Sequence, residues 1–149
     1  MSLVQEVAKG ATMWAAEMLC KDASYIPKEK LDWHPAENGS SVIEILTQVV
    51  DGNAALGAAI KGGTAGESVK GLSFEALKDR VMSSSKEVCE AIDSYRESAL
   101  MSDITMPWGM VMPASAAIML CASHMSYHDG QINYMQLLIG DTKFHWMEG

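Results

Sequence analysis

Two histidines in the C-terminal third of the chain have the type and spacing that metal chemistry requires. His124 and His128 are four residues apart, so in a helix they lie one turn apart on the same face. Two imidazoles in this arrangement can bind a single divalent metal ion. Zinc proteases share the spacing, but their first histidine is followed by a glutamate base, whereas here the next residue is Met125. The spacing therefore makes the two histidines candidate metal ligands and does not support that protease mechanism.

The two histidines belong to a helix face that is otherwise apolar. Its members are separated by three or four residues: Ala114, Ala117, Cys121, His124, His128, Gln131, Met135 and Leu138. Such a face is typical of the seam that a helix presents to the interior of a bundle. Burying polar side chains there costs free energy unless each finds a partner. Two interpretations follow: the histidines hold a metal, or they are joined in a hydrogen-bonded core network.

Four amphipathic segments must position these side chains, and each has recognisable helix-start or helix-stop residues. The predicted helices are about 20 residues ending before Pro27, Ser41 to Gly62, Ser73 to Tyr95, and Pro113 to Ile139 followed by Gly140. The predicted apolar stripe of the first helix is Val4, Val7, Ala8, Ala11, Trp14, Ala15, Met18 and Leu19. Because no segment alternates like a strand, we predict an all-α four-helix bundle that forms one domain over residues 1–149.

Composition excludes several classes of partner. The net charge of -8 disfavours binding to nucleic acid or to anionic lipid surfaces. No stretch approaches the roughly 20 apolar residues that cross a bilayer, and the first residues lack the pattern of a signal peptide. Three separated cysteines, Cys20, Cys89 and Cys121, indicate reduced thiols and no disulfide framework. We therefore expect a cytoplasmic protein with no nucleic-acid or membrane partner.

Three segments resemble the DinB/YfiT-like superfamily in the order and spacing of their motifs. The segment SHMSYHDGQINYMQLLIGD is similar to the family's last-helix signature, in which two histidines four residues apart precede a Gly-Gln pair. The segment IPKEKLDWHPAENGSSVIEILTQ resembles the family's connector and second-helix start, and MPWGMVMPAS resembles its segment before the last helix. The resemblance implies a left-handed four-helix bundle, commonly a homodimer, with a divalent metal held by three histidines.

The same resemblance implies which residues would hold the metal. Two family histidines map onto His124 and His128, and the third, on the second helix, falls at Gln48. An amide oxygen is a weaker ligand for zinc or nickel than an imidazole, so we expect metal binding to be weakened or lost. Glu44 and Asp51 lie one turn either side of Gln48. They are either substitute or outer-shell carboxylates or solvated surface charges.

Two functions are consistent with these residues. Characterised members of the resembled superfamily include transferases and isomerases that use low-molecular-weight thiols. The first hypothesis is a metal-dependent enzyme that transfers such a thiol onto a small electrophile, or a related hydrolase or isomerase. The alternative is a non-catalytic bundle that has lost its metal through Gln48 and binds a small molecule or acts in a stress response. In both cases the expected partner is a small molecule, and a homodimer is the expected assembly.

Five further residues could take part in the site or serve only as structural residues. Cys121 is either a thiolate next to the histidines or a buried apolar filler. Asp129 is a candidate to orient a metal-bound histidine, but a side chain next to His128 in sequence is expected to point elsewhere on the helix. Trp108 is either a lid over one mouth of the bundle or a buried corner. For His34 and His145 we expect surface or packing roles.

Overall fold

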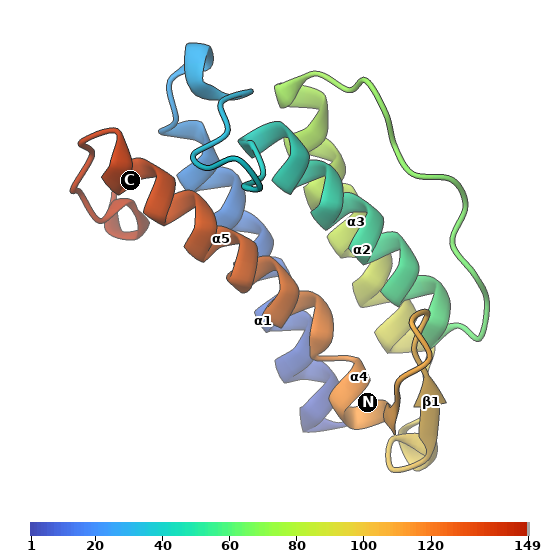
Figure 1. Ribbon diagram of the computed structural model, residues 1–149. Coiled ribbons are helices and arrows are strands. Elements are labelled where there is room, and N and C mark those ends of the chain that lie inside the picture. The colour runs from blue at the N-terminus through green and yellow to red at the C-terminus, as the bar shows by residue number, and fades with distance from the viewer. Residues whose placement is uncertain (149) are drawn as a thin grey trace.

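The computed structural model describes residues 1–148, which form four long helices packed side by side (Figure 1). The helices are α1 (Leu3–Ser24), α2 (Val42–Ile60), α3 (Phe74–Ser94) and α5 (Leu120–Leu138). The helix α1 packs against α5 and α3, and α2 packs against α3 and α5. The predicted all-α four-helix bundle is therefore confirmed. No helix within residues 1–148 is long and apolar enough to cross a membrane.

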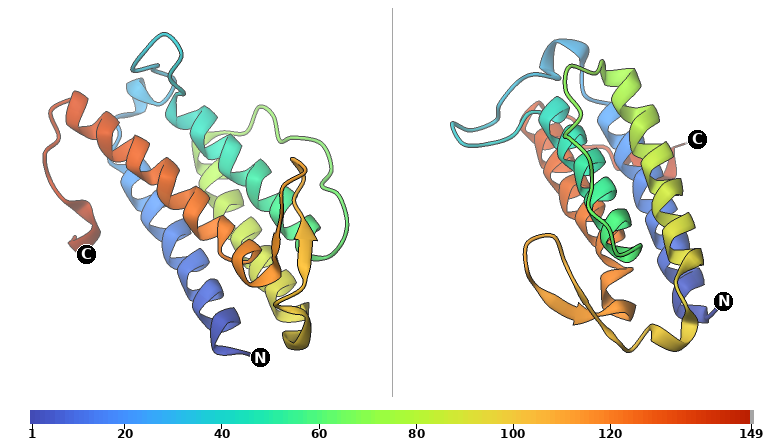
Figure 2. Two further views of the ribbon diagram at one scale, coloured as in Figure 1. Left: turned by 60° about the horizontal axis from the view of Figure 1, so that its bottom comes forward. Right: turned by 90° about the vertical axis from the view of Figure 1, so that its right-hand side faces the viewer.

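Short elements connect the helices at the two ends of the bundle. They are η1 (Lys28–Lys30), η2 (Glu97–Ala99), β1 (Asp103–Thr105), β2 (Val111–Pro113), α4 (Ala114–Ala117) and η3 (His145–Met147). The strands β1 and β2 form an antiparallel hairpin that lies beside the end of the bundle where α2 stops (Figure 2). Its turn is closed by the Met106 amide, which donates to the Met110 carbonyl at 2.8 Å. Gly109 adopts φ +86° in this turn, a conformation that favours glycine.

Local side-chain chemistry sets the helix ends where the sequence predicted them. The Ser41 hydroxyl accepts from the Glu44 amide at 3.2 Å, and the Glu44 carboxylate accepts from the Ser41 amide at 2.9 Å. The capping box at the start of α2 is therefore confirmed. Gly140 follows α5 with φ +90°, as expected for a helix stop. The predicted fourth helix is wrong in one respect, because α4 and α5 are separate helices with Ile118 and Met119 between them.

The helix α1 faces the core with a different stripe from the one predicted. Its buried residues are Gln5, Ala8, Thr12, Ala15, Ala16, Leu19, Asp22 and Ala23. By contrast, Val4, Val7 and Trp14 are 42%, 53% and 47% exposed, so the prediction that they face the core is wrong. The reason is hydrogen bonding, because the Gln5 amide donates at 2.9 Å to the carbonyls of Ile92 and Tyr95 at the end of α3. Those bonds fix the rotation of α1 and turn part of its apolar surface outward.

A buried polar cluster joins α1, α5 and the C-terminal segment. The Asp22 carboxylate accepts from the Trp146 indole at 2.7 Å and from the Asn133 amide at 3.0 Å. Asp129 is also buried. Within residues 1–148, neither the Oδ1 atom of Asp129 nor that of Asp22 has a conventional hydrogen-bond donor as a partner. Burial, with the neighbouring Asp22 adding to the effect, raises the pKa of Asp129 to about 8. A proton on Asp129 that is donated to Asp22 accounts for both atoms.

The variant Asp129→Asn is expected to lose less stability at alkaline pH than the parent. The pKa of Asp129 rises from 3.8 to about 8 on folding, so its stabilising contribution is complete below about pH 4. It is lost as the pH rises through about 8. Asparagine keeps a donor toward Asp22 and cannot ionise. Thermal unfolding at about pH 6 and about pH 9 should show a larger fall in Tm for the parent than for the variant. Equal falls would contradict the protonated state of Asp129.

Candidate metal and ligand site

The two histidines of α5 face each other through their Nε2 atoms. The distance between His124 Nε2 and His128 Nε2 is 3.0 Å, and the rings are nearly perpendicular with their centroids 4.5 Å apart. On its other side, His128 Nδ1 lies 2.7 Å from Gln131 Oε1. With the amide oxygen as acceptor, His128 carries its proton on Nδ1 and a lone pair on Nε2. The His124 Nε2–H group then donates to that lone pair.

The helix α5 presents this pair at the edge of the core. Its fully buried face contains Cys121, Ala122, Met125, His128, Asp129, Ile132, Met135 and Gln136. His128 is 4% exposed, whereas His124 and Gln131 are only half-buried and Leu138 is exposed. The predicted seam is therefore displaced toward one side of the helix, because Met125 rather than His124 fills the centre of the bundle. This displacement leaves the half-buried His124, and not the buried His128, in the lining of a pocket between α2 and α5.

Burial keeps both histidines uncharged, and His124 would bind a metal through Nε2 only after its proton moves from Nε2 to Nδ1. Desolvation lowers the pKa of His124 below its usual value, and the neighbouring His128 lowers it further. Desolvation also lowers the pKa of His128, although its hydrogen bond to Gln131 acts in the opposite direction. Both imidazoles are therefore neutral at pH 7, and metal coordination requires neutral imidazole.

The two Nε2 atoms are close enough to bind one metal ion. Two nitrogens at about 2.1 Å from an ion lie about 3.4 Å apart at the tetrahedral angle that zinc prefers and about 3.0 Å apart at a right angle. The observed separation of 3.0 Å matches the right angle, and it is also the length of an ordinary hydrogen bond between the two rings. However, no group of three or more His, Cys, Asp or Glu side chains within residues 1–148 is arranged to hold a metal. The remaining positions would have to be filled by an uncharged ligand such as an amide, by solvent or by a substrate.

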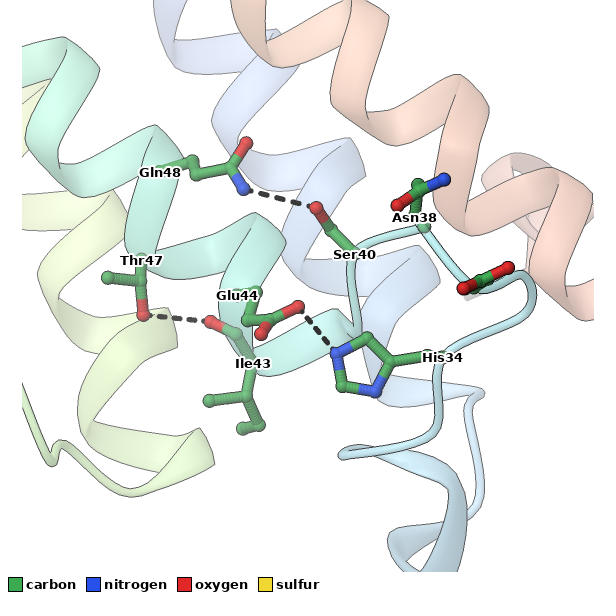
Figure 3. Close-up of a pocket in the computed structure, with 9 residues that line it drawn as sticks. His34, Asn38, Ser40, Ile43, Glu44, Thr47 and Gln48 are labelled. Carbon is green, nitrogen blue, oxygen red and sulfur yellow. Dashed lines mark hydrogen bonds and ion pairs between the residues drawn. The ribbon is translucent and has the colours of Figure 1, made fainter.

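Gln48 lies on α2 beside the connector that precedes this helix. Its amide nitrogen donates to Ser40 Oγ at 3.2 Å, which leaves its oxygen outside the hydrogen bonds drawn in Figure 3. It lines a polar pocket of about 510 Å³ together with His34 and Glu44. Glu44 accepts from the backbone of Ser41 and pairs with His34 Nε2 at 2.9 Å, so this carboxylate is engaged away from the histidine pair. Gln48 as a metal ligand stays a prediction.

An apolar pocket of about 580 Å³ opens beside His124. Its lining comes from α2, from the hairpin and from α5: Asp51, Gly52, Ala55, Leu56, Trp108, Leu120, Ser123, His124 and Tyr127. Trp108 is 57% exposed at the tip of the hairpin, which supports the lid interpretation over a buried corner. Asp51 at the rim accepts from the Ser68 hydroxyl and from the Val69 amide, so it is tied to the loop before α3.

A third pocket shares Tyr127 with the apolar one. Its volume is about 450 Å³, and its polar lining includes Ser40, Gln131 and Tyr134. Tyr127 contributes to both pockets and its ring lies 5.3 Å from that of His128. The histidine pair is thus flanked by one nearly apolar pocket and one pocket of mixed character.

The sequence model of the DinB superfamily matches residues 14–132, most of the chain and both histidines. This chain belongs to the DinB superfamily. No curated protein matches it. A DinB-family protein from Exiguobacterium sibiricum 255-15 has a similar crystal structure, with a TM-score of 0.71, 20% identity and 97% of each chain covered. A DinB-like protein from Bacillus cereus ATCC 10987 has a TM-score of 0.69 and 18% identity, over 85% of this chain and 87% of that one.

A third similar structure is a mutant of mycothiol-dependent maleylpyruvate isomerase. Its TM-score is 0.69 at 14% identity, and the match covers 89% of this DinB-superfamily chain and 63% of that chain. At this level of identity the similarity concerns the fold.

Within residues 1–148, the other residues singled out in the sequence make no hydrogen bond to the pair. Cys121 is 1% exposed, and burial raises the pKa of its thiol to about 12, so it is a core residue and no thiolate. Asp129 faces Asp22 on the other side of α5, so it does not orient His128. His145 is buried between Asp141 and Glu148, whose oxygens lie 2.7 Å from its two ring nitrogens. It therefore has a packing role in the C-terminal segment of this DinB-superfamily protein.

Proposed function

We propose that this DinB-superfamily protein binds zinc or nickel through His124 and His128, with the amide oxygen of Gln48 as a weak third ligand. The observation that carries the proposal is the 3.0 Å separation of the two Nε2 atoms. Gln131 supports it, because its contact with Nδ1 keeps the lone pair of His128 on Nε2. The lowered pKa values of both imidazoles keep the two rings uncharged at neutral pH.

The proposed reaction is transfer of a low-molecular-weight thiol onto a small electrophile. When bound, the metal would lower the pKa of a coordinated thiol or water and so supply a nucleophile at neutral pH. The apolar pocket beside His124 binds and orients the electrophile, and Trp108 restricts the access of water to it. Gln131 holds the proton on His128 Nδ1. The fold shared with a mycothiol-dependent isomerase supports thiol chemistry as the first to test.

A second function is supported by a separate observation. His124, His128 and Gln131 satisfy one another through two hydrogen bonds without any ion. Such a network is compatible with a small-molecule-binding protein that has lost its metal, in which the same pockets bind a ligand without catalysis.

The expected assembly is a homodimer and the expected compartment is the cytoplasm, as the family resemblance and the composition imply. Light scattering at micromolar concentration tests the assembly, since a monomer at that concentration would contradict it.

Elemental analysis of untagged protein tests the metal proposal directly. We expect near-stoichiometric zinc or nickel, or uptake on addition with a rise in Tm. Loss of the metal in His124→Ala would assign it to the pair. A protein that carries no metal, takes none up and shows no change in Tm would overturn the metal proposal and favour the ligand-binding function. Screening of thiols against electrophiles follows only on the first outcome.

A further inference from the structure

Gly52 lies on α2 directly against the ring of His124. A Cβ atom placed on Gly52 would lie 2.7 Å from His124 Cε1 and 2.8 Å from His124 Nδ1. Non-bonded heavy atoms pack at about 3.5–4.0 Å, so such an atom would force the ring to move. The imidazole of His124 therefore occupies the space that the Cβ atom of any other residue at position 52 would fill.

Packing rather than hydrogen bonding holds this edge of the ring. His124 Nδ1 is buried and has no hydrogen-bond partner within the described residues 1–148. The Nδ1–Cε1 edge rests on α2, and the opposite atom, Nε2, is directed at His128. Rotation of the His124 ring away from α2 would therefore break the contact between the Nε2 atoms of His124 and His128.

We propose that Gly52 is a positioning residue that sets the orientation of His124 by leaving the surface of α2 open to its ring. Glycine inside a helix destabilises it relative to alanine, so its presence here has a cost that the histidine contact explains. The inference rests on the histidine pair used in the proposed function, but it does not require that metal be bound.

The same helix contains a matched control. A Cβ atom on Gly57 would lie 3.5 Å from Val88 Cγ2, which is an ordinary contact. Gly57→Ala should therefore raise Tm by about 2–4 °C through better helix propensity. Gly52→Ala gains the same propensity but must displace an imidazole.

A double-mutant cycle in EDTA separates the two effects. Gly52→Ala should fail to raise Tm in the parent and should raise it by about 2–4 °C in the His124→Ala background, where the ring is absent. Gly57→Ala should raise Tm equally in both backgrounds. A Gly52→Ala variant that raises Tm equally in both backgrounds would overturn the positioning role, whether or not the protein binds metal.

Zinc affinity gives a readout that a purely structural role would not move. In calorimetric titrations with zinc alone, Gly52→Ala should weaken binding by about tenfold or more, as loss of ligand orientation does elsewhere. Gly57→Ala should bind like the parent. Unchanged affinity in Gly52→Ala would contradict the positioning role. If the parent binds no zinc, the proposed metal function fails and the double-mutant cycle alone decides the inference.

Discussion

Replacement of His128 by alanine is expected to reduce zinc or nickel affinity by about 100-fold or more. Loss of an outer-shell partner alone costs about 10–100-fold, and His128 supplies a donor atom itself. Its Nε2 lies 3.0 Å from that of His124, so its removal leaves a single imidazole at the site. Calorimetric titration of the metal into apo-protein measures the loss.

The control for this variant is His34→Ala. His34 is exposed and contacts Glu44 on the polar pocket, so its removal should leave metal affinity unchanged. His128→Ala should also lower Tm, because it leaves Gln131 and His124 without their partner at the edge of the core. Equal affinity in the His34 and His128 variants would place the bound metal elsewhere and contradict the proposed site.

The sequence predicts those parts of the fold that depend on neighbouring residues. The capping box of Ser41 and Glu44 and the left-handed Gly140 are short-range features, and both occur as predicted. The rotation of α1 depends on bonds from Gln5 to the distant end of α3, so a stripe of apolar residues could not indicate it. The hairpin was missed because three-residue strands contain too little alternation to identify.

The candidate site also has features that local sequence predicts and features that depend on distant residues. The four-residue spacing of His124 and His128 places their rings together in any helix, and the structure places them so. The pocket beside His124 joins α2, the hairpin and α5, and no local pattern predicts that meeting. The sequence interpretation also missed Gly52, although a helix-interior glycine one turn after Gln48 was a usable signal of close approach.

Gln48 explains why the parent site is expected to be weak, and its replacement by histidine is the second prediction with a large effect. Gln48→His should raise zinc or nickel affinity by about tenfold or more, because an imidazole replaces an amide oxygen as the third ligand. The change also removes the bond from Gln48 to Ser40, which is a single contact at an exposed position. Metal titration of the variant and the parent under the same conditions measures the gain.

The matched control is Lys61→His, which adds an imidazole at the exposed end of the same helix. This variant tests whether any added histidine raises metal affinity. We expect it to bind metal with the same affinity as the parent. If Gln48→His binds metal no more tightly than the parent, residue 48 is not the third ligand position. His124 and His128 would then have to act with solvent or substrate alone, and the apolar pocket beside them would be the better guide to function.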